Sequence, residues 1–339
     1  MLKIAIVTIN KPSFESAKKL EAYLENVDIY ISKKTPIDEE LKTNYIVFDK
    51  LDDILPAAWK SYDAIICILA IGAVVRKIAP LLKDKASDPA ILVINLALDK
   101  IVPLLSGHLG GANELANTLA LKLPNAINFI STATDQTKTI AFEMVAKKYN
   151  WQIINLKSLA NISNRLLNKQ SVKVATFKGI FETIKEKNLE LIDFENIDEN
   201  SVIISPFEYE VKNLHLKPKL FLGIGCNRGT SLKEIEEALF IFLEKFKLNI
   251  EQIENIGSFD AKSDEIGLLE FAKKYEFDIK FFSKDSINSI CTDLSKSKAT
   301  QFFGLKGVAE PSAILLSKFN ELIIKKEVYN KKITIAGAI

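Results

Sequence analysis

The 339-residue chain has few of the residues that build covalent or metal-bound frameworks, with three cysteines and two histidines. Cys67, Cys226 and Cys291 are odd in number and widely spaced, without a Cys-x-x-Cys pair, which excludes a disulfide framework and a zinc ribbon. With only His108 and His215 available, Asp or Glu would have to supply most ligands of a transition-metal site. We therefore expect reduced thiols and no metal held by the protein.

The chain also lacks a strong charge of either sign and long apolar runs. Its 45 Lys and Arg against 43 Asp and Glu give a formal net charge of +2, which provides no broad field for a polyanion such as DNA. The apolar runs at 64–73 and 89–97 are well short of the ~20 residues that cross a bilayer. We expect neither nucleic acid nor membrane as a partner. Residues 1–9 are typical of a first strand without a cleavage site, so we expect a cytoplasmic protein.

Strand patterns that alternate with helix patterns predict an α/β fold. Residues 1–134 are typical of a Rossmann-like domain with a mainly parallel sheet, whose ligands bind beyond the carboxyl ends of the strands. Residues 135–216 are more polar, and we interpret them as a small middle α/β segment. Proline and flanking charges predict a linker at 215–219, and a C-terminal α/β domain occupies 217–339. The strands expected in the two larger domains are 3–9, 28–31, 63–69, 90–94, 126–130, 220–225, 253–256, 278–282 and 332–336.

Three glycines surround a histidine in the segment 103–116. Glycines let the backbone approach a ligand, and the helix expected from about residue 110 offers N–H groups that favour an anionic oxygen. The spacing matches neither a dinucleotide fingerprint, a Walker A loop nor the Gly-x-Ser-x-Gly elbow of serine hydrolases. The segment predicts an oxyanion site with His108 as the proton-transfer group. The alternative is a tight turn with a structural histidine.

A second glycine-rich segment, 222–231, runs from the end of a predicted strand through a glycine loop to the start of a predicted helix. Ser231 and Glu234 form a capping box at the start of that helix. Arg228, just before it, is placed to clamp a carboxylate through two hydrogen bonds. The glycine offsets of two and six residues do not fit Gly-x-Gly-x-x-Gly, so a nucleotide site is the weaker alternative. We interpret Cys226 as a small packed residue rather than a nucleophile.

Polar residues at 258–265 precede an apolar helix. Lys262, Asp264 and Glu265 are candidates for ligand binding. The competing interpretation is that these residues only stabilise the start of the helix. Ser263 is a good N-cap, and acids in a first helical turn interact favourably with the helix dipole.

Two further charged residues stand near predicted helix starts. Glu310 precedes Pro311 at a predicted N-cap, where glutamate caps poorly, and this broken local rule indicates a functional role. Arg76 lies one turn into a helix at the expected ligand edge of the sheet. A solvated surface arginine is the alternative interpretation for Arg76.

Several short motifs follow one another along both ends of the chain. They are 72–76, Asp84-Lys85, Asp88-Pro89-Ala90, 104–116, Thr132-Ala133-Thr134-Asp135, 223–230, Lys262, Asp264-Glu265, 267–270, Gly307-Val308 and Glu310-Pro311. Taken in this order, they resemble the CbiG family of cobalt-precorrin-5A hydrolases. No sharp motif of the family matches in the middle region, 135–216, and the chain departs from the family pattern at 95–100 and at Asn227.

The resemblance implies a tripartite enzyme of cobalamin biosynthesis. It would open the δ-lactone of a cobalt-corrinoid, cobalt-precorrin-5A, and release acetaldehyde to give cobalt-precorrin-5B. Cobalt would arrive inside this small-molecule substrate, so no separate cofactor is expected. Other enzymes of the pathway are the remaining expected partners.

The chemistry of that reaction needs a base at the lactone and donors for an oxyanion. We hypothesise His108 as the base, Glu114 as its orienting carboxylate, the backbone of Gly110 and Gly111 as donors, and Glu310 as a catalytic alternative. Arg76 and Arg228 would hold substrate carboxylates. The other residues expected to bind substrate are Ser106, Gly107, Asn113, Asp135, Gly225, Asn227, Gly229, Thr230, Lys262, Asp264 and Glu265.

Two other functions compete with this interpretation. A non-catalytic carrier of corrinoid intermediates would bind the macrocycle and release no aldehyde. A nucleotide-dependent α/β enzyme would bind NAD or ATP tightly, although the glycine spacings argue against it.

Overall fold

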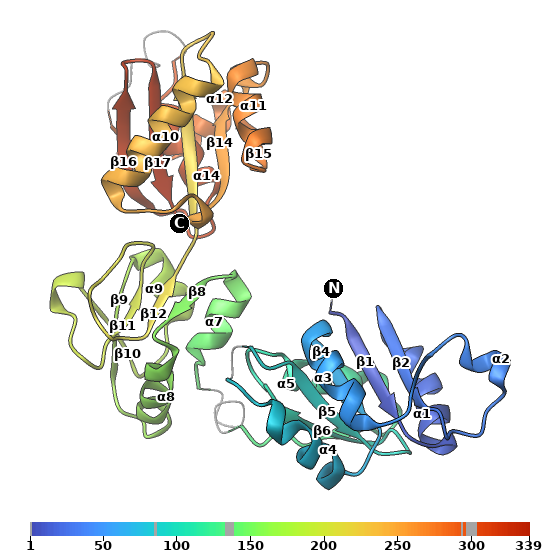
Figure 1. The fold of residues 1–339 in the computed structure, drawn as a ribbon. Helices are drawn as coiled ribbons and strands as arrows, with labels where there is room; N and C mark the ends of the chain where they lie inside the picture. Colours follow the sequence, from blue (N-terminus) through green and yellow to red (C-terminus); the bar gives the residue numbers. More distant parts are fainter. Residues whose placement is uncertain (1, 85–86, 133–138, 293, 296–303) are drawn as a thin grey trace. The chain divides into compact units, whose positions relative to one another are not determined.

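The computed structural model describes residues 2–84, 87–132, 139–292, 294–295 and 304–339. The chain divides into two compact units, residues 1–139 and 140–339. The described residues form three β-sheets, one in the first unit and two in the second (Figure 1). The predicted α/β fold class is confirmed. The division into parts at 134 and 216 stays a prediction beside this two-unit arrangement.

The first unit is built on a seven-stranded sheet of order β3-β2-β1-β4-β5-β6-β7. Neighbouring strands are parallel except β5 and β6, which are antiparallel. The strands are β1 Ile4–Thr8, β2 Val27–Ser32, β3 Ile46–Phe48, β4 Ala64–Cys67, β5 Ala90–Ile94, β6 Lys100–Leu105 and β7 Ile127–Asn128. The helices are α1 Lys11–Glu21, α2 Glu39–Lys42, α3 Leu51–Ser61, α4 Ile71–Ile78, the 3-10 turn η1 Ala79–Leu81, and α5 Ala112–Lys122.

Alternate side chains of β1 pack on opposite faces of this sheet. Ile4 and Ile6 share a buried cluster with side chains of α1 and α5, whereas Ala5 and Val7 share another with side chains of α3 and α4. Because strand side chains alternate in direction, this division places helices on both faces of a buried central strand. The first unit is therefore a three-layer α/β structure.

A tight turn at 95–99 reverses the chain between β5 and β6. The Asn95 side chain accepts the N–H groups of Asp99 at 3.1 Å and Lys100 at 3.0 Å, and it donates to the Asp99 carboxylate at 2.7 Å. Asparagine side chains commonly close turns in this way. As a result, the end of β6 lies beside the start of β5, with Leu105 paired to Ile91.

The first sheet of the second unit has the order β10-β9-β11-β12-β8, and β8 is antiparallel to β12. Its strands are β8 Gln152–Ile154, β9 Val172–Thr176, β10 Leu189–Ile192, β11 Val202–Ile204 and β12 His215–Lys217. Its helices are α7 Phe142–Tyr149, α8 Leu159–Leu167 and α9 Lys178–Ile184, with 3-10 turns η2 Leu156–Ser158 and η3 Phe194–Asn196.

The linker predicted at 215–219 is wrong for most of its length. Residues His215–Lys217 form the buried strand β12, which pairs with both β11 and β8. Polar partners make this burial possible, because His215 Nε2 lies 2.8 Å from the Ser205 carbonyl oxygen and the Lys217 ammonium pairs with Glu208. Only two residues then separate β12 from the next sheet.

That sheet has the order β15-β14-β13-β17-β16. Its strands are β13 Leu220–Cys226, β14 Ile253–Phe259, β15 Ile279–Phe282, β16 Leu322–Tyr329 and β17 Ile333–Ala338. Its helices are α10 Leu232–Phe246, α11 Ile266–Lys274, α12 Lys284–Ser289 and α14 Ala309–Leu316, with 3-10 turns η4 Ile250–Gln252 and η5 Asp260–Lys262.

Helix α14 packs directly on β13, and glycine makes this possible. A Cβ atom at Gly223 would lie 1.8 Å from the carbonyl oxygen of Ala309 in α14. Side chains of β13 that face the other way, such as Leu222 and Ile224, share a core with α10 and α11. The glycines of 223–225 therefore let a helix approach the sheet closely.

Two predicted helix starts are wrong. The N-cap of α14 is Val308, so Glu310 is its second residue rather than its cap. The helix can begin ahead of Pro311 because N–H groups of the first turn lack intrahelical partners anyway. The N-cap of α11 is Glu265, because Ser263 instead ends the 3-10 turn η5. In the described part of the chain, no helix is long and apolar enough to cross a membrane.

Candidate functional site

The loop that joins β6 to α5, residues 106–111, is called the His108 loop and has a constrained backbone. Ser106 has a φ of 56° and Gly111 a φ of 85°, both in the left-handed region. The Ser106 carbonyl accepts the N–H of Ala112 at 3.2 Å, and the Gly107 carbonyl accepts that of Asn113 at 3.0 Å. A left-handed serine is uncommon and costs free energy, so the surrounding contacts must hold it. Such strained loops are frequent at functional sites.

Three of the segments that carry the sequence resemblance meet at this loop. The Ser106 hydroxyl donates to the Asp88 carbonyl oxygen at 2.8 Å. The Asn113 side chain donates to the Thr132 hydroxyl at 3.2 Å. The structure thus brings the segments around 88, 106–113 and 132 to one place. The predicted residue Asp135 lies outside the described residues.

His108 is half-buried in this loop, as are Ser106, Gly107 and Gly110, so solvent or a ligand reaches it. The Gly111 N–H donates to the His108 carbonyl oxygen at 3.0 Å and is therefore already used. The Gly110 N–H, by contrast, makes no hydrogen bond to any described residue. Of the two expected oxyanion donors, Gly110 is the one whose N–H is available. Glu114 is exposed in the first turn of α5.

The structure does not bring Arg76 to the His108 loop. Helix α4 follows β4, so its first residues lie at the edge of the sheet where β4 and β5 end. The His108 loop follows β6, which runs antiparallel to β5, and so lies at the opposite edge. Arg76 is exposed, and its Nη1 donates to the Gly72 carbonyl oxygen of its own helix at 3.1 Å.

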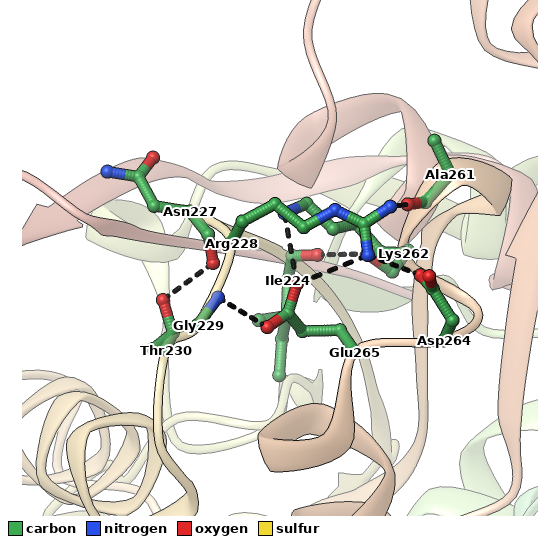
Figure 2. Close-up of polar contacts among 10 residues, drawn as sticks. Ile224, Asn227, Arg228, Gly229, Thr230, Ala261, Lys262, Asp264 and Glu265 are labelled. Atoms are coloured by element: carbon green, nitrogen blue, oxygen red, sulfur yellow. Dashed lines mark hydrogen bonds and ion pairs between the residues drawn. The ribbon is translucent and has the colours of Figure 1, made fainter.

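In the second unit, the loops after the parallel neighbours β13 and β14 meet at one edge of the sheet. Figure 2 shows their polar contacts. The Gly229 N–H donates to Glu265 Oε1 at 2.7 Å, and Lys262 Nζ lies 3.3 Å from Glu265 Oε2. The Thr230 hydroxyl donates to the Asn227 carbonyl oxygen at 2.8 Å. The Glu265 side chain, only 5% exposed, joins the two loops.

Arg228 lies across these loops on the solvent side (Figure 2). Its Nη1 donates to the Asp264 carboxylate and its Nη2 to the Ala261 carbonyl oxygen at 2.9 Å. The hydrogen bond from Arg228 lowers the pKa of the Asp264 carboxyl below its usual value. The cluster therefore gathers the predicted residues Asn227, Arg228, Gly229, Thr230, Lys262, Asp264 and Glu265.

Gly225 and Cys226, neighbouring residues at the end of β13, are in environments that favour packing over ligand binding. A Cβ at Gly225 would lie 2.6 Å from the Thr334 hydroxyl oxygen of β17 and 3.2 Å from the Val308 Cβ, so this glycine serves packing. Burial raises the pKa of the Cys226 thiol to about 11. A thiol protonated at neutral pH is a poor nucleophile, which agrees with its interpretation as a packed residue.

Glu310 is 3% exposed and holds three hydrogen bonds. Its carboxylate accepts the N–H and the hydroxyl of Ser295, each at 2.7 Å, and the N–H of Lys326 at 2.9 Å. Burial acts to raise the pKa of this carboxyl, but the hydrogen bonds from Lys326 and Ser295 outweigh it and hold the pKa below the usual value. Glu310 thus ties α14 to β16 and to Ser295 as an ionised group.

Lys332 is a residue of the second cluster that the sequence analysis missed. Its carbonyl oxygen accepts the N–H of Asn227 at 3.0 Å, and its Nζ lies 2.8 Å from Glu234 Oε1. Lys332 and the hydrogen bonds from Ser231 lower the pKa of Glu234 to about 2. The only sequence signal was a lysine at the start of a predicted strand, and the pairing of β17 with β13 brings it to the loop.

Within the described ranges, no group of three or more His, Cys, Asp or Glu residues is arranged to hold a metal ion.

Models of cobalamin synthesis proteins match most of the chain, in three consecutive segments between residues 53 and 338. The cobalamin synthesis G N-terminal model matches residues 53–135, the cobalamin biosynthesis central region 140–218, and the cobalamin synthesis G C-terminus 220–338. The fold and these matches define the class as an α/β protein of cobalamin biosynthesis.

Curated relatives narrow this class. A cobalt-precorrin-5A hydrolase of Priestia megaterium is 31% identical, covering 98% of this chain and 94% of its own. One from Salmonella typhimurium is 30% identical over 93% and 92% of the two chains. A probable cobalt-precorrin-5A hydrolase of Methanocaldococcus jannaschii is 27% identical over 86% and 89%. The chain belongs to the cobalamin synthesis G (CbiG) family, as its sequence motifs predicted.

Proposed function

We propose that this chain is a cobalt-precorrin-5A hydrolase, which opens the δ-lactone of its substrate and releases acetaldehyde to give cobalt-precorrin-5B. The observation that carries the proposal is the similarity to the Priestia megaterium enzyme, which covers 98% of this chain and 94% of that one. The similarity covers all three segments that the family models match. The proposal therefore concerns the activity of the whole chain rather than that of one of its domains.

The His108 loop supplies what lactone opening requires. Hydrolysis needs a base that takes a proton from water as the water attacks the lactone carbonyl, and a donor for the resulting oxyanion. His108 acts as the base, and the Gly110 N–H, which has no partner among the described residues, acts as the donor. The bond between Ser106 and Asp88 keeps the two groups in one loop conformation.

Release of acetaldehyde is the second step. Lactone opening leaves a free hydroxyl next to the carbon-carbon bond that must break. A base removes the hydroxyl proton, the new carbonyl forms acetaldehyde, and the macrocycle takes the electron pair of the broken bond. Cobalt belongs to the substrate in this scheme, and we propose no separate cofactor.

The cluster of polar residues around Arg228 and Glu265, called the Arg228 cluster, is suited to bind the carboxylates at the periphery of such a substrate. Corrinoid intermediates carry acetate and propionate carboxylates, and arginine binds carboxylates through paired hydrogen bonds. Arg228 is 61% exposed, and Lys262 lies in the loop after β14. The turn before β17 reaches the same place, because the Lys332 carbonyl oxygen accepts the N–H of Asn227, the residue before Arg228. We propose that this cluster holds one peripheral carboxylate.

The direct test is anaerobic incubation of the full-length protein with cobalt-precorrin-5A while acetaldehyde is trapped and counted. One aldehyde per macrocycle supports the proposal. Binding of the macrocycle without aldehyde release would overturn it and would indicate a carrier instead. A His108→Asn variant, which keeps a side chain of similar polarity without the basic imidazole, serves as the matched control.

A further inference from the structure

We propose that Asp264 occupies, in the unliganded protein, the position that a carboxylate of the ligand takes on Arg228, so that binding displaces Asp264 while the guanidinium stays in place. This inference rests on the proposed function only in the choice of ligand, a carboxylate-rich corrinoid. Asp264 would then be an internal competitor that sets affinity and selectivity, rather than a group that contacts substrate.

Two adjacent carboxylates, Asp264 and Glu265, have opposite environments. The Glu265 side chain is 5% exposed and receives hydrogen bonds from the Gly229 N–H at 2.7 Å and from Lys262 at 3.3 Å. The Asp264 side chain is 70% exposed and receives a hydrogen bond from a single described side chain, Arg228. A ligand can therefore replace Asp264 without disturbing Glu265.

The loop does not need the Asp264 contact to keep its shape. Glu265 already joins the two loops, and a Cβ at Gly267 would lie 2.1 Å from the Thr230 carbonyl oxygen, which shows how closely they pack. The pair formed by Arg228 and Asp264 lies outside this packing on the solvent side (Figure 2). Its removal leaves the framework of the cluster intact.

Arg228 stays oriented when Asp264 leaves. Its Nη2 donates to the Ala261 carbonyl oxygen at 2.9 Å, and its Nη1 lies 3.9 Å from Glu265 Oε2. These two contacts hold the guanidinium, so a ligand carboxylate meets a preorganised donor and loses little side-chain entropy on binding. Exposed ion pairs are weak and are screened by water, so the ligand has only a small competing interaction to break.

The test compares two corrinoid probes that differ in their periphery. Dicyanocobyrinic acid carries free carboxylates, whereas in dicyanocobinamide these groups are amides. Binding of each to the full-length protein is measured by titration for the wild type, Asp264→Asn, Arg228→Gln and the double variant. Asp260→Asn is the matched control, because Asp260 is an exposed acid of the same loop that makes no ion pair within the described residues.

We expect Asp264→Asn to bind the carboxylate probe about two- to fivefold more tightly, the range set by the strength of an exposed ion pair, and to leave amide binding unchanged. Arg228→Gln should weaken binding of the carboxylate probe about tenfold, and in the double variant the Asp264 substitution should have no effect. Asp260→Asn should produce a smaller gain than Asp264→Asn.

Weaker or unchanged carboxylate binding by Asp264→Asn would overturn the inference, as would an equal gain for both probes or for Asp260→Asn. Thermal unfolding of each variant shows whether it is folded. The outcome is separate from that of the proposed function. Intact acetaldehyde release without the binding differences overturns only the role of Asp264, whereas the binding differences without aldehyde release overturn only the proposed activity.

Discussion

The Ser106 hydroxyl donates a 2.8 Å hydrogen bond to the carbonyl oxygen of Asp88, and this bond joins the His108 loop to the residues that lead into β5. The Asp88 carboxylate in turn accepts the N–H of Lys83 at 3.1 Å. Ser106 makes its bond from a left-handed backbone conformation. Backbone strain and an anchoring side chain therefore coincide in the residue two positions before His108.

Substitution of Ser106 separates these two effects. Ser106→Ala loses the anchor and keeps the strain, so we expect the free energy of unfolding to fall by about 1 kcal/mol. Ser106→Gly also loses the anchor but relieves the left-handed strain, a gain of about 1 kcal/mol that restores most of the stability. Both should release acetaldehyde more slowly, because the His108 loop is no longer held. Urea unfolding and initial rates measure the two effects. Full activity in both variants would show that the anchor is not needed.

The His108 side chain should be needed for turnover and not for folding. Removal of a general base slows reactions by about 10²- to 10⁴-fold, and we expect acetaldehyde release by His108→Asn to fall within that range. Because His108 is only half-buried, the thermal midpoint should change little. An unchanged rate in a correctly folded variant would contradict its role as the base.

Substitution by alanine at two glycines of the first unit should change the free energy of unfolding in opposite directions. A Cβ at Gly110 would lie 2.4 Å from the Ser106 Cβ and 2.9 Å from its carbonyl oxygen, so Gly110→Ala should destabilise the protein by about 1–3 kcal/mol. Apart from its chain neighbours and the backbone of its own helix, a Cβ at the exposed Gly72 of α4 would, among the described residues, approach the end of the Arg76 side chain at 3.3 Å and nothing else within 4 Å. Gly72→Ala should therefore stabilise the helix by about 0.5–1 kcal/mol. Chemical denaturation of the pair tests this contrast, and equal effects would contradict it.

The stabilising effect of Glu310 should depend on pH. Its pKa in the folded protein is lowered below the ordinary value of 4.5. The stabilisation is thus complete above that ordinary value and is lost as the pH falls through the folded pKa. Glu310→Gln should cost about 2 kcal/mol at pH 7, because it removes a buried charged acceptor of three hydrogen bonds. Unfolding curves of both proteins from pH 7 to pH 3 should converge, and a constant difference would refute the ionised state.

Some local signals in the sequence predicted local structure correctly, although the N-caps expected at Ser263 and Glu310 were wrong. The capping box of Ser231 and Glu234 is present at the start of α10, and the buried runs 90–94 and 220–225 form β5 and most of β13. These features depend on residues close in sequence, where side-chain chemistry determines the backbone. The family could also be identified, because its motifs lie in a fixed order.

Features that depend on strand pairing could not be predicted. Nothing in the alternation of strands and helices shows that β6 runs antiparallel, and this reversal puts Arg76 and the His108 loop at opposite edges of the sheet. From the sequence, Lys217 was expected to be solvated. In the structure it lies in a buried strand, where Glu208 neutralises its charge, and this pairing is formed only in the folded chain. The pairing of Arg228 with Asp264 likewise joins residues that are 36 positions apart.

The reversed strand β6 also offers a practical attachment point. The turn at 95–99 and the His108 loop lie at opposite ends of the same hairpin, on the order of 17 Å apart along the five residues of β5. Leu96, at that turn, is 52% exposed. A chromophore linked there through Leu96→Cys, after the exposed Cys291 is replaced by serine, would report on the protein without entering the neighbourhood of His108, since Cys67 and Cys226 are buried.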